Sequence, residues 1–102
     1  MTIDNELKRE SRWVVMLALY HARELGLSDR LIERSLEKLP HLRSTITTVQ
    51  EMLHYLKALE LAEVTDLIDG SLHAKRTAKC VDVVEYNAPC PESIARPADK
   101  WW

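Results

Sequence analysis

The sequence is poor in glycine and cysteine, and these two shortages exclude several classes of protein. It contains two glycines in 102 residues, and none of the motifs GxxxxGK, GxGxxG or GxSxG that mark nucleotide-binding loops and serine hydrolases is present. Its two cysteines, Cys80 and Cys90, are too few for the disulfide framework of a secreted domain, so we expect reduced thiols. No pair among the histidines and cysteines has CxxC or HxxxH spacing, and no nucleophile motif is present. We therefore expect no metal, no cofactor and no enzymatic activity.

Long hydrophobic runs are also absent. The longest, Trp13 to Tyr20, is far shorter than the roughly 20 residues of a membrane span. Charged residues crowd the start of the chain, where a secretory signal would be apolar. These features predict a cytoplasmic protein without membrane contact. The 14 basic and 16 acidic residues give a net charge of -2, which argues against strong non-specific nucleic-acid binding but leaves room for a local basic face.

What the sequence does have is helical periodicity, with 46% hydrophobic residues, enough for one globular domain. The first predicted helix runs from about Asp4 to Leu25 and stops at Gly26. Apolar residues cover most of its sides, so we expect it to be the central helix, with His21 as a hydrogen-bonded core histidine. Apolar residues repeat at helical spacing in one strip, Val14, Leu17, Ala18, His21 and Leu25, and a second apolar strip consists of Trp13, Met16 and Tyr20.

Two shorter helices are predicted next. Ser28 is a favourable N-cap for the second helix, Asp29 suits the positive end of its dipole, and Pro40 ends it. Either Ser44 or Thr45 caps the third helix. The predicted buried stripes are Leu31, Ile32, Ser35, Leu36 and Leu39 in the second helix and Ile46, Val49, Leu53 and Leu56, widened by Met52 and Leu59, in the third.

The next part of the chain has the pattern of a β-hairpin. Residues 61–68 alternate as a strand does, and residues 71–76 would return as the partner strand. Asp69 and Gly70 form a dipeptide favoured in two-residue turns, in which both central positions need positive φ. Because a lone hairpin is marginal in water, we expect its apolar face to dock on the helices.

After the hairpin, Thr77 would cap a short helix carrying Cys80 and Val84, although the β-branched valines there would also suit a longer strand. The order of helices and hairpin predicts a mainly α fold with a small β-hairpin, a winged helix-turn-helix whose recognition element is the third helix. We place this domain at residues 1–86 and an extended, proline-rich C-terminal tail at residues 87–102.

Two segments after the hairpin carry a resemblance to known families. Residues 76–81, RTAKCV, resemble the LTxxG element that closes the wing in many bacterial winged-helix regulators, with Arg76 and Cys80 in place of the usual leucine and glycine. Residues 81–97, VDVVEYNAPCPESIARP, resemble a family of small winged-helix proteins of Mu-like prophages. The resemblance implies a phage-encoded winged-helix protein in the cytoplasm of a bacterial host, and by analogy of fold it implies DNA binding.

If the third helix enters a DNA groove, its N-terminal residues are the candidate readers. Gln50 can pair bidentately with adenine, and Thr47 can offer a hydroxyl or a methyl group to base edges. Basic residues around this helix and on the second strand are candidates for phosphate contacts. The predicted DNA-binding residues are Arg43, Ser44, Thr47, Thr48, Gln50, Lys57, Lys75 and Arg76.

Alternatives stay open for these sites. Glu51, in the centre of the polar face of the third helix, would repel phosphate, which favours a protein–protein adaptor in phage assembly. Lys75 and Arg76 also suit a solvated strand edge. Trp101 and Trp102 would expose a large apolar area unless they dock, either on their own domain or on the partner subunit of the homodimer that we expect.

Overall fold

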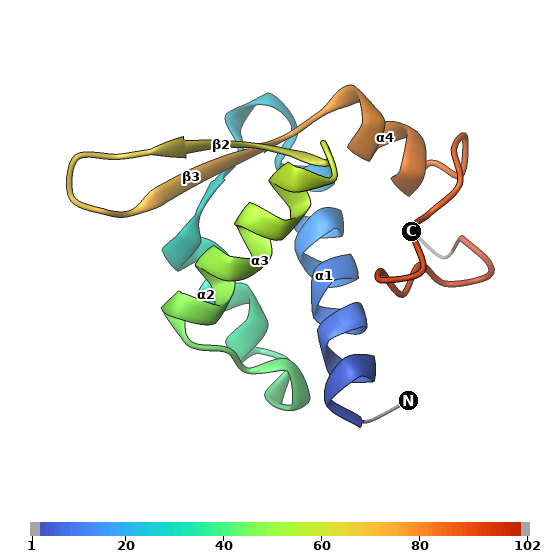
Figure 1. The fold of residues 1–102 in the computed structure, drawn as a ribbon, viewed down its shortest axis with the longest axis horizontal. Helices are drawn as coiled ribbons and strands as arrows, with labels where there is room; N and C mark the ends of the chain where they lie inside the picture. Colours follow the sequence, from blue (N-terminus) through green and yellow to red (C-terminus); the bar gives the residue numbers. More distant parts are fainter. Residues whose placement is uncertain (1–2, 101–102) are drawn as a thin grey trace.

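The computed structural model describes residues 3–100. The fold is mainly helical, with a small antiparallel sheet in the strand order β1-β3-β2 (Figure 1). This confirms the predicted mainly α architecture with a hairpin. The elements are α1 (Ile3–Ala22), η1 (Arg23–Leu25), β1 (Leu27–Ser28), α2 (Asp29–Glu37), η2 (Pro40–Leu42), α3 (Ile46–Ala58), β2 (Ala62–Asp66), β3 (Leu72–Arg76) and α4 (Ala78–Val84).

Helix α1 is the centre of the core and contacts α2, α4 and β3. Its buried apolar side chains are Trp13, Val15, Met16 and Leu19. In the first predicted strip, Val14, Leu17 and Ala18 are half-buried, and the expectation is wrong for His21 and Leu25, which are exposed. In the second predicted strip, Trp13 and Met16 are buried and Tyr20 is half-buried. Because the helix is apolar on most sides, its sequence periodicity does not indicate which face is buried. After Ala22 the chain continues as the short 3-10 helix η1 and then turns at Gly26, which has a φ of 68°.

Helices α2 and α3 begin at predicted caps. Ser28 Oγ accepts a hydrogen bond from Leu31 N at 3.2 Å. Of the two candidate caps for α3, Thr45 is the one used, because its Oγ1 accepts from Thr48 N at 3.2 Å. The buried residues are Asp29, Ile32 and Leu36 of α2 and Val49, Met52, Leu53 and Leu56 of α3. The predicted stripes were therefore too wide, since Leu31 and Ser35 are exposed and Leu39 and Ile46 are half-buried.

The predicted hairpin is present, and it gains a third strand that the sequence did not predict. Strands β2 and β3 pair antiparallel from Ala62↔Arg76 to Asp66↔Leu72. Strand β1 pairs with the other edge of β3, at Leu27↔Ala74 and Ser28↔His73. A two-residue strand is too short for an alternating pattern to reveal it.

The turn between β2 and β3 is longer than the predicted two-residue turn. Leu67 N donates to Ser71 O at 2.9 Å, and Gly70 N donates to Leu67 O at 3.0 Å, which is the pattern of a three-residue loop closed by glycine. Gly70 has a φ of 85°, whereas Asp69 does not have a positive φ. The carboxylate of Asp69 instead accepts hydrogen bonds from Ser71 N at 3.0 Å and Ser71 Oγ at 2.6 Å, which holds the longer loop.

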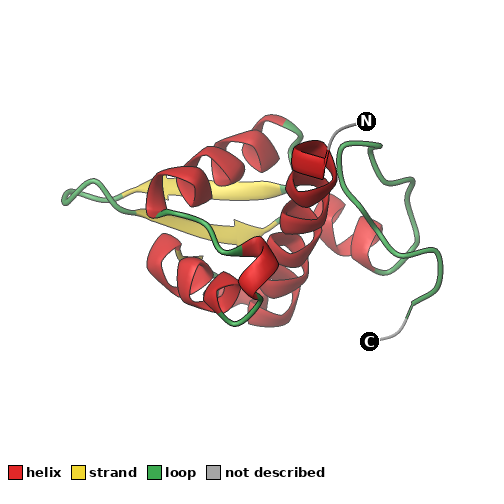
Figure 2. Cartoon of the chain, turned by 90° about the horizontal axis from the view of Figure 1, so that it is seen from below, coloured by secondary structure: helices red, strands yellow, loops and turns green. Residues whose placement is uncertain are grey.

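The segment after the hairpin is a helix and not a longer strand. Thr77 Oγ1 accepts from Cys80 N at 3.1 Å at the start of α4. Figures 1 and 2 show the rest of the chain on the α4 side of α1, away from the turn of the hairpin. There Ile94 is buried, and Ala95 N donates to Arg9 O at 3.1 Å. The described part of the tail thus packs on its own domain.

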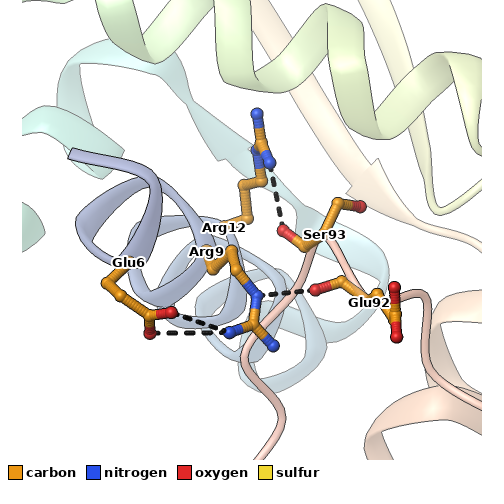
Figure 3. Close-up of polar contacts among 5 residues, drawn as sticks. All are labelled: Glu6, Arg9, Arg12, Glu92 and Ser93. Carbon is orange, nitrogen blue, oxygen red and sulfur yellow. Dashed lines mark hydrogen bonds and ion pairs between the residues drawn. The ribbon is translucent and has the colours of Figure 1, made fainter. Parts of the chain in front are cut away.

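Two arginines of α1 hold this tail through its backbone (Figure 3). Arg9 Nε donates to the carbonyl oxygen of Glu92 at 2.6 Å, and Arg12 donates to that of Ser93 at 3.0 Å. Arg9 also forms an ion pair with Glu6 at 3.3 Å. The prediction for Trp101 and Trp102 lies outside the described residues.

Candidate nucleic-acid interface

The N-terminal end of α3 carries several of the predicted DNA-binding residues. Arg43, Thr47 and Thr48 are exposed there. Ser44 is half-buried, and its hydroxyl donates to Leu42 O at 2.9 Å. The hydroxyl of Ser44 is thus used within the turn before the helix. The hydroxyl of Thr48 is exposed and lies 3.1 Å from that of Thr45.

Gln50 makes contacts that the sequence did not reveal. Its amide nitrogen Nε2 donates to Asp29 Oδ2 at 2.8 Å and lies 3.3 Å from the carbonyl oxygen of Gly70. The two hydrogens of this amide group therefore point into the protein, toward α2 and the turn of the hairpin. Bidentate pairing with adenine needs the same amide group, which in this structure is used in contacts within the protein.

Asp29 is the buried partner in this network, with 1% of its surface exposed. Its Oδ2 also accepts a hydrogen bond from Leu72 N, the first residue of β3, at 3.1 Å. Its Oδ1 is buried and has no hydrogen-bond partner among the described residues. The sequence showed only that Asp29 suits the start of a helix, and no local pattern reveals a contact with residues this distant along the chain.

The remaining predicted cations are spread over the molecule. Lys57 is exposed in the last turn of α3, and Lys75 is exposed on β3 opposite Glu63. Arg76 is half-buried: it donates to Tyr20 O at 3.0 Å, and its guanidinium lies 5.4 Å from the centre of the Tyr20 ring. Arg76 therefore packs the base of the hairpin against α1, and its guanidinium is used there.

Two exposed arginines share a face of α2 and were not among the predicted residues, and one of them, Arg30, lies near the hairpin turn. Arg30 and Arg34 are exposed and one helical turn apart. The pKa of Asp69 lies below its usual value, mainly because Ser71 donates hydrogen bonds to it, and the nearby positive charge of Arg30 adds to the effect. Arg30 thus lies close to the turn. The four-residue spacing of the two arginines was visible in the sequence as a shared helix face.

Acidic and apolar groups also lie on this surface. Glu51 is exposed on α3, and Ile68 at the tip of the hairpin is fully exposed. A groove of about 460 Å³ separates the first half of α1 from the start of α3, and Lys8, Arg43 and Glu51 are among its lining residues. The surface around α3 is therefore of mixed charge, in keeping with the net charge of -2.

Cys80 is buried and Cys90 is half-buried. Burial raises the pKa of the Cys80 thiol to about 11. Partial burial also raises the pKa of Cys90. Within residues 3–100, no three His, Cys, Asp or Glu side chains are grouped so that they could share a metal ion. Both cysteines are free thiols that are protonated at neutral pH.

Comparisons with known proteins found no match to a protein-family model, a curated protein or a solved structure. Over the described part of the chain, none of the helices combines the length and the hydrophobicity needed to cross a membrane.

Proposed function

We propose that this protein is a winged-helix protein that binds double-stranded DNA through α3 and the β2–β3 hairpin, which we call the wing. The order of elements supports the fold: a helix, a short strand, two helices and a hairpin whose second strand pairs with the short strand. In such a fold α2 and α3 form the helix-turn-helix, and α3 is the recognition helix. Because a fold alone does not define a function, the case for DNA binding depends on the geometry around α3.

The observation that carries the proposal is the contact between α3 and the turn of the wing. Gln50 Nε2 lies 3.3 Å from Gly70 O, so the N-terminal half of α3 and the tip of the wing lie side by side. Figure 1 shows the hairpin reaching out beyond the helices on this side. A recognition helix in the major groove with a hairpin beside it contacts base edges and the neighbouring backbone together.

The exposed residues divide between base and phosphate contacts. Thr47 and Thr48 present hydroxyl and methyl groups that suit base edges. Arg43 at the start of α3 and Arg30 and Arg34 on α2 suit phosphates. With about three phosphate contacts, the logarithm of the binding constant should fall with the logarithm of salt concentration with a slope of about -3.

The biological role that we propose is regulation of phage genes or handling of phage DNA in a bacterial cytoplasm. The resemblance of residues 81–97 to small winged-helix proteins of Mu-like prophages supports this setting. A homodimer would place two copies of α3 on half-sites separated by about 10 base pairs, one turn of the duplex. Selection of bound sequences from a random pool would reveal such a repeat.

Fluorescence anisotropy on a labelled pool of random duplexes of about 25 base pairs tests the proposal, at about 50 to 200 mM salt. Arg43→Ala should weaken binding to all sequences and make the salt slope shallower by about one unit. Lys100→Ala is the matched control, because it removes an exposed cation from the tail and should leave the slope unchanged. No binding by the unaltered protein at about 50 mM salt, or an equal loss in both variants, would refute it.

A protein–protein adaptor is the second candidate, and the tip of the wing favours it. Ile68 has a relative exposure of 109%, and its neighbours include Asp69, which phosphate would repel. An exposed aliphatic residue beside a carboxylate suits a protein surface better than a DNA backbone. If the anisotropy assay shows no DNA binding, loss of a phage-protein complex on Ile68→Lys would support the adaptor.

A further inference from the structure

We propose that Asp29 is a positioning residue that holds the tip of the wing beside the N-terminal half of α3. This inference rests on the proposed function, because it explains how the two DNA-contacting elements are kept in one orientation. Asp29 faces no DNA itself, since it is almost completely buried. Its effect on binding would pass through the hydrogen bonds that it accepts.

The carboxylate of Asp29 joins three elements at one point. It starts α2, accepts from Gln50 of α3 at 2.8 Å, and accepts from the backbone of Leu72 in β3 at 3.1 Å. The amide of Gln50 extends the connection to the carbonyl oxygen of Gly70, in the turn of the wing. The wing is thus held at both its turn and the start of its second strand by one network.

The turn of the wing has little other support. Ile68 and Leu67 are exposed rather than packed on the core. No heavy atom lies within 4 Å of the position that a Cβ atom would take on Gly70. The buried apolar residues of the hairpin, Ala62 in β2 and Leu72 and Ala74 in β3, hold the strands rather than the turn. Since packing does not fix the tip, its place beside α3 depends on the polar network.

A carboxylate suits the first turn of α2, but its nearly complete burial is unusual for an acidic residue and indicates that its hydrogen bonds matter. A buried charge without a cation is costly unless donors compensate it. The positive end of the α2 dipole and two donors partly meet this requirement here, while Oδ1 has no partner among the described residues. An apolar residue would bury more easily but would leave Leu72 N without its acceptor and would remove one of the two acceptors of the Gln50 amide.

Two substitutions of Asp29 should have different effects, because one keeps a side-chain oxygen acceptor and the other removes it. In Asp29→Asn, the side-chain oxygen can still accept from Gln50 and Leu72, so the wing should keep its place. In Asp29→Ala, both donors lose this acceptor, so the turn should move relative to α3. Asp66→Ala is the matched control, because Asp66 lies opposite Leu72 in the register but is exposed.

Amide hydrogen exchange followed by NMR tests this network without DNA. The Leu72 amide should exchange at least about tenfold faster in folded Asp29→Ala than in the unaltered protein, the equivalent of one lost hydrogen bond. Asp29→Asn and Asp66→Ala should change it less than about threefold, within the spread of ordinary surface substitutions. Equal protection of the Leu72 amide in all three variants would overturn the inference, independently of any result on DNA binding.

DNA anisotropy is the second measurement, made on the folded fraction of each variant. Asp29→Ala should weaken binding by about tenfold, a loss comparable to one misplaced contact, whereas Asp29→Asn should restore it. If Asp29→Ala does not fold, Gln50→Ala takes its place, since it removes the link from α3 to both Asp29 and the turn and leaves the hydrogen bond from Leu72 N to Asp29 in place. Altered exchange with unchanged affinity would overturn the positioning role and leave the proposed function standing. Absence of binding by the unaltered protein would mean that the proposed function itself has failed, and the role in DNA binding would fail with it.

Discussion

Replacing Ile94 with alanine should lower the free energy of unfolding by about 2–3 kcal/mol. Ile→Ala substitutions in cores cost about 2–5 kcal/mol, and the cost is smaller where neighbours can close the cavity. Ile94 is 2% exposed, but it lies in a tail without regular secondary structure, which can relax more than a helix. The lower half of the range therefore applies.

Urea unfolding measures this change, with helical circular dichroism as the signal. Ile68→Ala is the matched control, because the same side chain is removed from a fully exposed position and should change the stability by less than about 0.5 kcal/mol. The mass of Ile94→Ala in light scattering should equal that of the unaltered protein, because the described tail contacts its own domain.

Two results would refute this account of the tail. If Ile94→Ala and Ile68→Ala were equally stable, the tail would not be part of the folded unit. If Ile94→Ala lowered the oligomer mass instead of the stability, the tail would dock on a partner subunit. Both results would also remove the role of the hydrogen bonds from Arg9 and Arg12 to the tail backbone.

Three further predictions concern the stability of the core at Leu53, the reactivity of Cys80 and the pH dependence caused by Tyr20. Leu53→Ala should lower the free energy of unfolding by about 2–5 kcal/mol in the same urea assay, because Leu53 is fully buried; a loss below about 0.5 kcal/mol would contradict its place in the core. Cys80 should resist iodoacetamide at about pH 8 in the native protein and react after unfolding, since burial raises its pKa to about 11; rapid native labelling, followed by mass spectrometry, would contradict this. The hydrogen bond to Glu85 raises the pKa of Tyr20 above 10.0, so its contribution to stability should be complete below pH 10.0 and be lost as the pH rises through the higher folded value. Tyr20→Phe should lack this alkaline loss, and an identical pH profile of unfolding would count against the contact.

Features set by neighbouring residues could be predicted from the sequence. Ser28 and Thr77 cap the helices that they were expected to cap, because a cap needs only a side-chain oxygen and a backbone N–H three residues later. The hairpin was located by alternation, although its turn is longer than expected because the carboxylate of Asp69 binds Ser71. The stripe of α3 was also largely correct, because that helix has one clear apolar face.

Only the tertiary structure decided which groups distant in sequence share a surface. The buried face of α1 could not be chosen from a helix that is apolar on most sides. The guanidinium of Arg76 lies against Tyr20, a contact that no local pattern in the sequence indicates. The hydrogen bonds that join Asp29 to Gln50 and Leu72 cross the whole helix-turn-helix segment. A pattern in sequence reports which side chains share a face of one element, whereas the partner of a buried polar group depends on how several elements pack, and no local spacing records that.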